Sequence, residues 1–376
     1  MAQLKTEVPS CCGIAEGTLV LTKQGFLPIE EIEVGDFVVA QDGKLHKVIN
    51  TVVGGKTDVT FLKAPGIFPI LLTGGQELYV RIGARDAAPC WMTADELLNA
   101  DMRHCYLGVP INRRSAILRW DGVPFYIGRA FQGMKCNLDP TDDRLWYLAG
   151  RYLGDGWMGK TSKEKRHKAS YNRVVICCGK HKTEVFKAKI AGYLPYFLDA
   201  AKTTDNFIFS SIELVAFLQE FGIGARNKQI PGFVFNLPAT KLCALLQGYT
   251  DSDGYVNRVY KRTEFTSVSK ALTLGIVQIY QKLYHVYGNL FVTKGREGGL
   301  PQIVGHPVNV HDCYHARFCW KKTPDTCFHD GMIWYPITSM GKMAERHQTH
   351  NLIVDGAHAY VAENCIVHDF QGSEAR

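Results

Sequence analysis

Two acidic residues, Asp155 and Asp253, each end a similar stretch of sequence and are each followed by glycine. The first stretch, residues 148–156, reads Leu-Ala-Gly-Arg-Tyr-Leu-Gly-Asp-Gly, and the second, residues 246–254, reads Leu-Gln-Gly-Tyr-Thr-Asp-Ser-Asp-Gly. Two helices with small residues on one face can approach closely and bring the carboxylates at their ends side by side. Such a pair favours Mg²⁺, which keeps water and accepts phosphate oxygens, so this chemistry suits phosphodiester hydrolysis.

The two stretches belong to a longer pattern that occurs twice. Each is followed by a basic, strand-like segment, and then by residues with helical spacing. One such ending alone is typical of an ordinary helix terminus with a solvated aspartate. Two copies with the same residue order, separated by a domain-sized interval, instead favour a shared function. The middle of the chain therefore predicts an internal duplication of a helix-strand-helix unit.

The flanking regions have a different hydrophobic pattern, in which short apolar and polar runs alternate. Residues 17–53 predict strands and hairpins, with a turn at residues 41–43, and further strands follow. A short helix is predicted after Thr93, which has Glu96 three residues later as in a capping box. The strand-like pattern occurs again after about residue 311. A β-rich region is thus expected to be interrupted by a duplicated α/β region.

Composition narrows the function classes only partly. The 376 residues suffice for two or three domains, and the net charge of +7 favours a polyanionic partner without requiring one. The first residues lack a signal-peptide pattern and no apolar run is long enough to cross a membrane, so we expect an intracellular protein, cytoplasmic or nuclear, with no membrane partner. The twelve cysteines form no CxxC pair, which favours free thiols over zinc ligands or disulfides.

The two acidic stretches resemble the paired motifs of LAGLIDADG homing endonucleases, in the form that carries both motifs in one chain, over about residues 143–310. The resemblance implies a monomer that cuts double-stranded DNA at a long specific site and uses Mg²⁺. Asp155 and Asp253 match the acids that bind the catalytic metals, one active centre for each DNA strand. Asp251 matches a position at the helix interface, where the first copy has Leu153.

Between the two copies, Lys228-Gln229-Ile230-Pro231 resembles the family's Lys-x-Ile-Pro element. The resemblance implies that Lys228 lies beside the scissile phosphate and stabilises developing negative charge. A lone lysine is usually only solvated surface, and that alternative stays open.

The strands after each motif combine basic and aromatic residues. In the family these strands form a saddle along the major groove, where alternate side chains meet bases and phosphates. The alternative is that they are the polar faces of two-sided strands. Tyr255 and Tyr260 lie among the basic residues, and the residues assigned to DNA binding are Tyr171, Arg173, Arg258, Lys261 and Arg262.

Segments on both sides of the duplicated region, in about residues 13–110 and 333–369, resemble an intein, the protein-splicing fold. In that family a Cys or Ser at the first position attacks the preceding carbonyl, helped by the His of a Thr-x-x-His element. Here the first position is Gly13, although Cys12 precedes it, and the element keeps Thr73 but has Gln76 in place of the histidine. Glutamine cannot exchange a proton near neutral pH.

The far end of the intein-like region departs from the family as well. Splicing there needs His, then Asn, then Cys, Ser or Thr, whereas this chain has His368, Asp369 and Phe370. Four changes at chemical positions of a preserved scaffold predict that splicing is lost. The splicing-like remnants are then Cys12, Gly13, Thr73, Gln76, His368 and Asp369.

The sequence therefore predicts an α+β protein in which an all-β intein-like horseshoe domain is interrupted by a pseudo-symmetric endonuclease domain. The expected bounds are 13–125 and 325–369 for the intein-like parts and 140–310 for the endonuclease, with repeats at 143–225 and 240–310. One rival function is protein splicing through unusual junctions, with Cys12 as nucleophile. Another is an RNA-splicing maturase or a DNA-binding module without nuclease activity. The retention of both acidic ligands argues against this alternative.

Overall fold

The computed structural model describes residues 6–7, 12–84, 86–111, 138–160, 171–295, 300–303, 306–308, 311–320 and 326–370. The protein is α+β, with more strand than helix, and its chain forms two compact units. The first unit contains Met1–Arg113, Arg258–Arg262 and Tyr280–Arg376, and the second contains Arg114–Asn257 and Thr263–Ile279. Each unit is thus built from segments that are not contiguous in the sequence.

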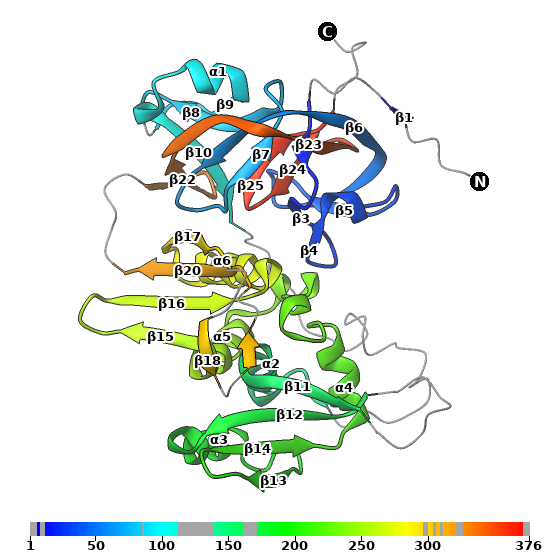
Figure 1. Ribbon diagram of the computed structural model, residues 1–376, viewed down its shortest axis with the longest axis vertical. Coiled ribbons are helices and arrows are strands. Elements are labelled where there is room, and N and C mark those ends of the chain that lie inside the picture. Colours follow the sequence, from blue (N-terminus) through cyan, green and yellow to red (C-terminus); the bar gives the residue numbers. More distant parts are fainter. Residues whose placement is uncertain are drawn as a thin grey trace. The chain divides into compact units, whose positions relative to one another are not determined.

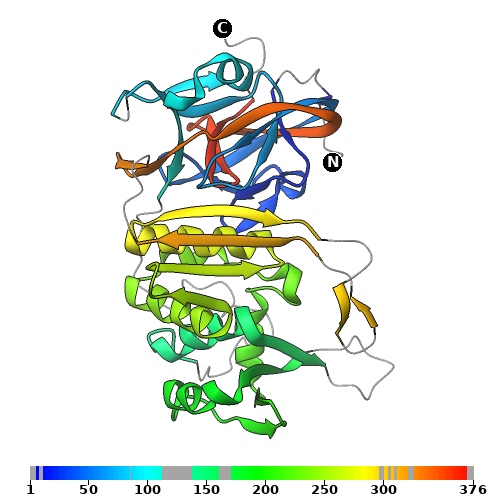
Figure 2. The same ribbon diagram turned by 60° about the vertical axis from the view of Figure 1, so that its left-hand side comes forward.

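Two long strands organise one sheet of the first unit. β6 (Leu45–Lys63) and β23 (Ser339–Val354) pair antiparallel along most of their length, as Figures 1 and 2 show. The sheet has the order β1-β6-β23-β2-β7, and β5 also pairs with β6. Its shorter strands are β1 (Thr6–Glu7), β2 (Ile14–Ala15), β5 (Phe37–Val39) and β7 (Ile70–Leu72).

The other large sheet of the first unit has the order β21-β22-β10-β8-β25-β24-β3-β4, with β9 beside β8. Aliphatic side chains from both sheets, such as Leu62, Val80, Leu352 and Val367, are fully buried in one core. Its strands are β3 (Leu19–Leu21), β4 (Phe26–Pro28), β8 (Glu77–Ile82), β9 (Cys90–Thr93), β10 (Cys105–Pro110), β21 (Cys327–His329), β22 (Met332–Pro336), β24 (Ala359–Ala362) and β25 (Cys365–His368).

Shorter elements complete the first unit. The helix α1 (Ala94–Asn99) begins at Thr93 and Glu96, which form the predicted capping box. The strands β17 (Tyr287–Thr293) and β20 (Cys313–Cys319) pair antiparallel, as do β18 (Leu300–Ile303) and β19 (His306–Val308). The 3-10 helices here are η1 (Ile29–Glu31) and η2 (Met102–His104).

A two-residue turn joins β24 to β25. Glu363 and Asn364 both have positive φ, +47° and +81°, which costs energy for residues other than glycine. Both side chains are buried, and their long-range hydrogen bonds offset this strain. Leu19 N donates to Glu363 Oε1 over 2.9 Å, and Asn364 Nδ2 donates to the Gly66 carbonyl over 3.2 Å. The hairpin is thereby fixed, together with His368 at its end.

In the second unit, a helix leads directly into a strand twice. α2 (Asp143–Asp155) continues into β11 (Gly156–Lys160), and α5 (Ala239–Asp253) continues into β15 (Gly254–Asn257). After β11 a sheet forms with the order β11-β12-β14-β13. The remaining elements are β12 (Tyr171–Gly179), η6 (Lys180–Lys182), α3 (Thr183–Ile190), β13 (Phe197–Ala200), β14 (Thr204–Phe209), α4 (Ile212–Gln219), η7 (Ala225–Asn227), η8 (Gly232–Asn236) and most of β16 (Arg262–Ser267) and of α6 (Lys270–Tyr284). No helix in the described ranges is long and apolar enough to cross a membrane.

Candidate active site

The helices α2 and α5 pack against each other through glycine (Figure 1). A Cβ atom on Gly150 would lie 2.0 Å from the carbonyl oxygen of Leu245, and one on Gly248 would lie 2.1 Å from that of Tyr147. No side chain fits at either position, so the two backbones are in direct contact. The predicted approach of the two helices at their small residues is confirmed.

We expect Gly150→Ala to destabilise the protein, because the new methyl group forces the two helix backbones apart. Overpacking of this kind costs about 1–3 kcal/mol, more than the gain in helix propensity of about 1 kcal/mol for replacing glycine. Gly55→Ala is the control, since a Cβ there meets no atom within 4 Å. Thermal unfolding of both variants checks the prediction, and equal midpoints for Gly150→Ala and the natural chain would contradict the close contact.

The glycine after each acid ends its helix in the same way. A Cβ on Gly156 would lie 2.5 Å from the Cα of the residue four positions earlier, and one on Gly254 would lie 2.6 Å from the corresponding atom. Their φ angles, −97° and −81°, are ordinary. The predicted helix stop at each glycine is confirmed, and neither glycine needs a left-handed conformation. Glycine is needed because the chain turns back closely over its own last turn.

The structure brings Asp155 and Asp253 together at the ends of the paired helices. A Cβ on Gly154 would lie 3.2 Å from the carboxyl carbon of Asp253, so the last turn of α2 touches this side chain. The pKa of Asp253 is raised, first because surrounding protein displaces water and second because Asp155 adds a negative charge nearby. Asp155 is about one third exposed and accepts a hydrogen bond from Arg151 Nη2 over 3.2 Å.

Lys228 lies at the same place, but it acts on the backbone. Its buried Nζ donates to the carbonyl oxygens of Tyr152, Gly154 and Gly156, at 2.7, 3.2 and 3.0 Å. Burial lowers its pKa to about 8, against the opposing charges of Asp253 and Asp155. An ammonium group has three hydrogens, and all three are used here. Lys228 therefore holds the end of α2, and it can act on a phosphate only through its charge unless these bonds exchange.

Two cations near the acids were not singled out from the sequence. Arg151 lies within the first motif and is only 1% exposed. A charged residue among small and apolar neighbours is a sequence signal that could have marked it as a candidate site residue. Lys182 Nζ donates to the carbonyls of Asp251 and Ser252, at 2.8 and 3.4 Å, so it holds the last turn of α5. Nothing in its local sequence marks Lys182, because this contact depends on tertiary structure.

The donor set at the helix ends fits Mg²⁺ better than a softer metal. Both carboxylates are hard oxygen donors, and burial together with the nearby Asp155 raises the pKa of Asp253 despite the neighbouring cations. Among the described residues, no group of three or more His, Cys, Asp and Glu side chains forms a metal cluster. Two carboxylates would leave most positions to water and phosphate oxygens, as is usual for Mg²⁺ in sites that act on phosphates.

The predicted DNA-binding residues lie on the strands after each helix. Arg173 is exposed on β12 opposite Gly159 of β11, whose lack of a side chain leaves room for the Arg173 side chain. Arg258 and Lys261 are exposed between β15 and β16, and Arg262 begins β16 with its guanidinium 5.3 Å from the centre of the Tyr260 ring. The side chain of Tyr171 lies outside the described part.

The splicing-like residues also converge, within the first unit. Gly13 N donates to Thr73 Oγ1 over 2.9 Å, and Cys12 Sγ donates to the Gly75 carbonyl over 3.3 Å. Gln76 Nε2 donates to the carbonyl of His368 over 2.9 Å. The buried Gln76 thus connects the two ends of the intein-like region as a fixed amide.

Asp369 is buried beside two histidines. Its carboxylate accepts a hydrogen bond from Val354 N over 3.0 Å and lies 3.4 Å from His358 Nδ1 and 3.3 Å from His368 Nδ1. Burial alone would lower the pKa of His368, but the interactions with Asp369 outweigh it, and the net shift is upward. A positively charged His368 is therefore favoured, and its partner is a carboxylate rather than an amide.

No family model matches the chain. It is 32% identical over 142 residues to a DNA polymerase of Thermococcus sp. (strain GE8), covering 36% of this chain and 8% of that protein. It is 25% identical over 387 aligned positions to an iron-sulfur cluster assembly SufBD family protein of Mycobacterium tuberculosis, covering 94% of this chain and 42% of that protein. The chain therefore spans less than half the length of these curated relatives.

Two kinds of solved structure are similar at a coarse level. One is the homing endonuclease I-DmoI in complex with DNA and Ca, at 16% identity and a TM-score of 0.32, covering 47% of this chain and 83% of that one. The other is a variant of the Ssp DnaB mini-intein, at 10% identity and a TM-score of 0.33, covering 98% of this chain and 99% of that one.

Proposed function

We propose that the chain is a site-specific endonuclease of the LAGLIDADG type that cuts both strands of duplex DNA, carried on an intein-like domain that has lost splicing. The observation that carries the proposal is the meeting of Asp155 and Asp253 at the ends of two duplicated, glycine-packed helices. Two carboxylates held side by side repel each other, so this arrangement suits the binding of a cation better than it suits folding. This arrangement also favours an enzyme over a DNA-binding module that does not cut.

In this proposal Asp155 and Asp253 would hold Mg²⁺, which when bound would supply activation of water and neutralisation of charge on the phosphate. Lys228 keeps the end of α2, and so Asp155, in place through its three bonds to carbonyls. Its positive charge lies beside the carboxylates and lowers the cost of bringing a phosphate to them. Arg151 orients Asp155 through their 3.2 Å contact.

Arg173 on β12, with Arg258, Lys261 and Arg262 around the turn before β16, would contact phosphates and base edges of the duplex. Tyr171 is assigned to the same surface from the sequence. One duplex bound across both repeats needs no second copy of the chain, so we propose a monomer. The proposed domain bounds are those expected from the sequence, 13–125, 140–310 and 325–369.

The curated relatives support an element that is inserted into other proteins. Their names include DNA polymerase, an iron-sulfur cluster assembly protein, reverse gyrase and an RNA polymerase subunit, and the chain covers between 8% and 42% of their lengths. Similar segments within proteins of unrelated function are expected of a mobile coding element. An endonuclease that cuts a long DNA site would supply that mobility.

We expect duplex DNA binding by the natural chain to weaken steeply with salt. The four basic residues Arg173, Arg258, Lys261 and Arg262, each neutralising one phosphate, contribute about −3.6 to the slope of log K against log salt, at about −0.9 per phosphate. Fluorescence anisotropy with a labelled duplex between low and physiological salt measures it. An affinity that does not change over this range would remove DNA as the partner.

A further inference from the structure

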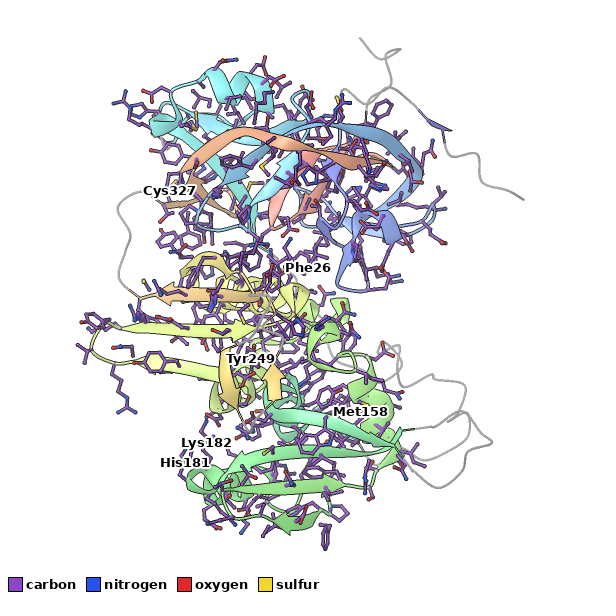
Figure 3. The ribbon with its side chains drawn as sticks, viewed as in Figure 1. Phe26, Met158, His181, Lys182, Tyr249 and Cys327 are labelled. Atoms are coloured by element: carbon purple, nitrogen blue, oxygen red, sulfur yellow. The ribbon has the colours of Figure 1, made fainter. Side chains whose placement is uncertain are left out.

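A pocket of about 330 Å³ opens in the second unit beside the last turn of α5. Arg151 of α2, His181 and Lys182 of η6, and Asp251 of α5 all line it. Figure 3 shows His181 and Lys182 next to one another where β12 leads into α3. Three groups that can carry positive charge and one carboxylate therefore share its wall.

Arg151 has hydrogen-bonding capacity that the described residues leave unused. Its Nη2 donates to Asp155 Oδ2 and to the Cys177 carbonyl, at 3.2 and 3.1 Å. Its Nε is buried and makes no hydrogen bond within the described part of the chain. A buried donor without an acceptor costs about 1–3 kcal/mol, and more for a charged group. The guanidinium in the pocket wall therefore has donor capacity that no acceptor among the described residues uses.

Lys182 is held in a position to meet an anion. The carbonyls of Asp251 and Ser252 accept two of its three hydrogens, which fixes the ammonium group at the pocket while leaving one hydrogen to donate. The carboxylate of Asp251 is engaged by the hydroxyl of Tyr147 over 2.9 Å. It is thus held towards α2 rather than paired with Lys182.

The short segment that carries His181 and Lys182 is anchored at both ends by one buried carboxylate. Asp205 accepts hydrogen bonds from Lys180 Nζ over 2.5 Å and from Thr183 Oγ1 over 2.7 Å. These two bonds lower the pKa of Asp205, so it stays ionised at neutral pH. The two basic side chains are therefore positioned before any ligand arrives, which reduces the ordering cost of binding.

We propose that this pocket binds one backbone phosphate of the DNA strand, adjacent to the bond that is cut. Arg and Lys together are the usual partners of a phosphate, and Arg151 contacts both the pocket and Asp155. In this proposal the neighbouring phosphodiester of the same strand lies at the paired acids, because Arg151 contacts Asp155 and also lines the pocket. The inference rests on the proposed function and adds a residue set, Arg151, His181 and Lys182, that positions the strand.

The test compares Lys182→Met with Lys187→Met, using fluorescence anisotropy of a labelled duplex over a series of salt concentrations. Lys187 is a control on the neighbouring helix α3, paired with Glu184 over 2.8 Å and absent from the pocket wall. Loss of one phosphate contact in Lys182→Met should make the slope of log K against log salt shallower by about 0.9. A tenfold drop in salt would then raise the affinity of this variant about eightfold less than it raises that of the natural chain. Lys187→Met should keep the natural slope, and Lys182→Arg should restore it.

Thermal unfolding of each variant shows that a changed slope does not reflect unfolding. A natural slope in folded Lys182→Met would overturn the inference while leaving the proposed function standing. Absence of salt-dependent binding by the natural chain would instead remove the proposed function itself. Titration with inorganic phosphate distinguishes a DNA phosphate from a free anion. If Lys182→Met loses binding of inorganic phosphate but keeps the natural salt slope for the duplex, the pocket is a free-anion site and the assignment to DNA is overturned.

Discussion

Asp155→Asn and Asp253→Asn will each abolish double-strand cleavage while leaving duplex binding nearly unchanged. Asparagine has the shape of aspartate but not its charge, so the glycine contacts between α2 and α5 remain and the cation loses a ligand. Removing several kcal/mol of transition-state stabilisation slows the reaction by about 10³-fold, at 1.36 kcal/mol for each factor of ten. The measurement is single-turnover cleavage of a duplex that the natural chain cuts, with binding followed separately.

The matched control is Asp143→Asn, the same substitution at the opposite end of α2. Asp143 is 57% exposed and pairs with Lys241 over 2.5 Å, away from the helix ends that carry the acids. We expect this variant to cut as fast as the natural chain, since surface ion pairs contribute little. Full cleavage by either Asp155→Asn or Asp253→Asn would contradict the assignment of the paired acids.

Foreign domains fused to both ends of the chain will not be ligated to each other. The four positions that splicing chemistry needs carry Gly13, Gln76, Asp369 and Phe370, and the steps are sequential. Gly13 and Phe370 remove the attacking groups outright, and Gln76 in place of histidine slows the first step by at least about 10²-fold, the lower range for losing acid-base assistance. Mass spectrometry of the purified fusion detects or excludes a product with the summed mass of the two foreign domains.

Geometry strengthens this expectation at the first position. A Cβ on Gly13 would lie 3.1 Å from the carbonyl oxygen of His350, so even a restored nucleophile would be crowded. Residual chemistry should be confined to one end, where the retained His368 can assist slow cleavage after Asp369. A ligated product that disappears in Cys12→Ala would make splicing the main function instead.

Features that depend on a few neighbouring residues could be predicted from the sequence. The capping box of Thr93 and Glu96 forms as expected, and the predicted turn at residues 41–43 has Gly43 at a φ of +70°. Both motif helices end at their acids, Asp155 and Asp253. In each case the signal lies within one turn of chain, so tertiary packing has little opportunity to override it.

Features set by distant partners could not be predicted in this way. Gly54 and Gly55 are typical of a break and predict that a strand ends near Val53, yet β6 runs through them because β23 pairs along its length. The three carbonyl partners of Lys228 and the contact of Lys182 with α5 are of the same kind. No local pattern encodes a hydrogen bond between residues about seventy positions apart.

Mapping of cut ends in a library of long DNA duplexes, incubated with the purified chain and Mg²⁺, tests the central proposal most directly. We predict that sequencing finds one long recurrent site, cut on both strands, only when Mg²⁺ is present and only with both Asp155 and Asp253 intact. Recurrent cutting by a chain that carries both Asp155→Asn and Asp253→Asn, or no cutting by a folded natural chain that binds the duplexes, would contradict it.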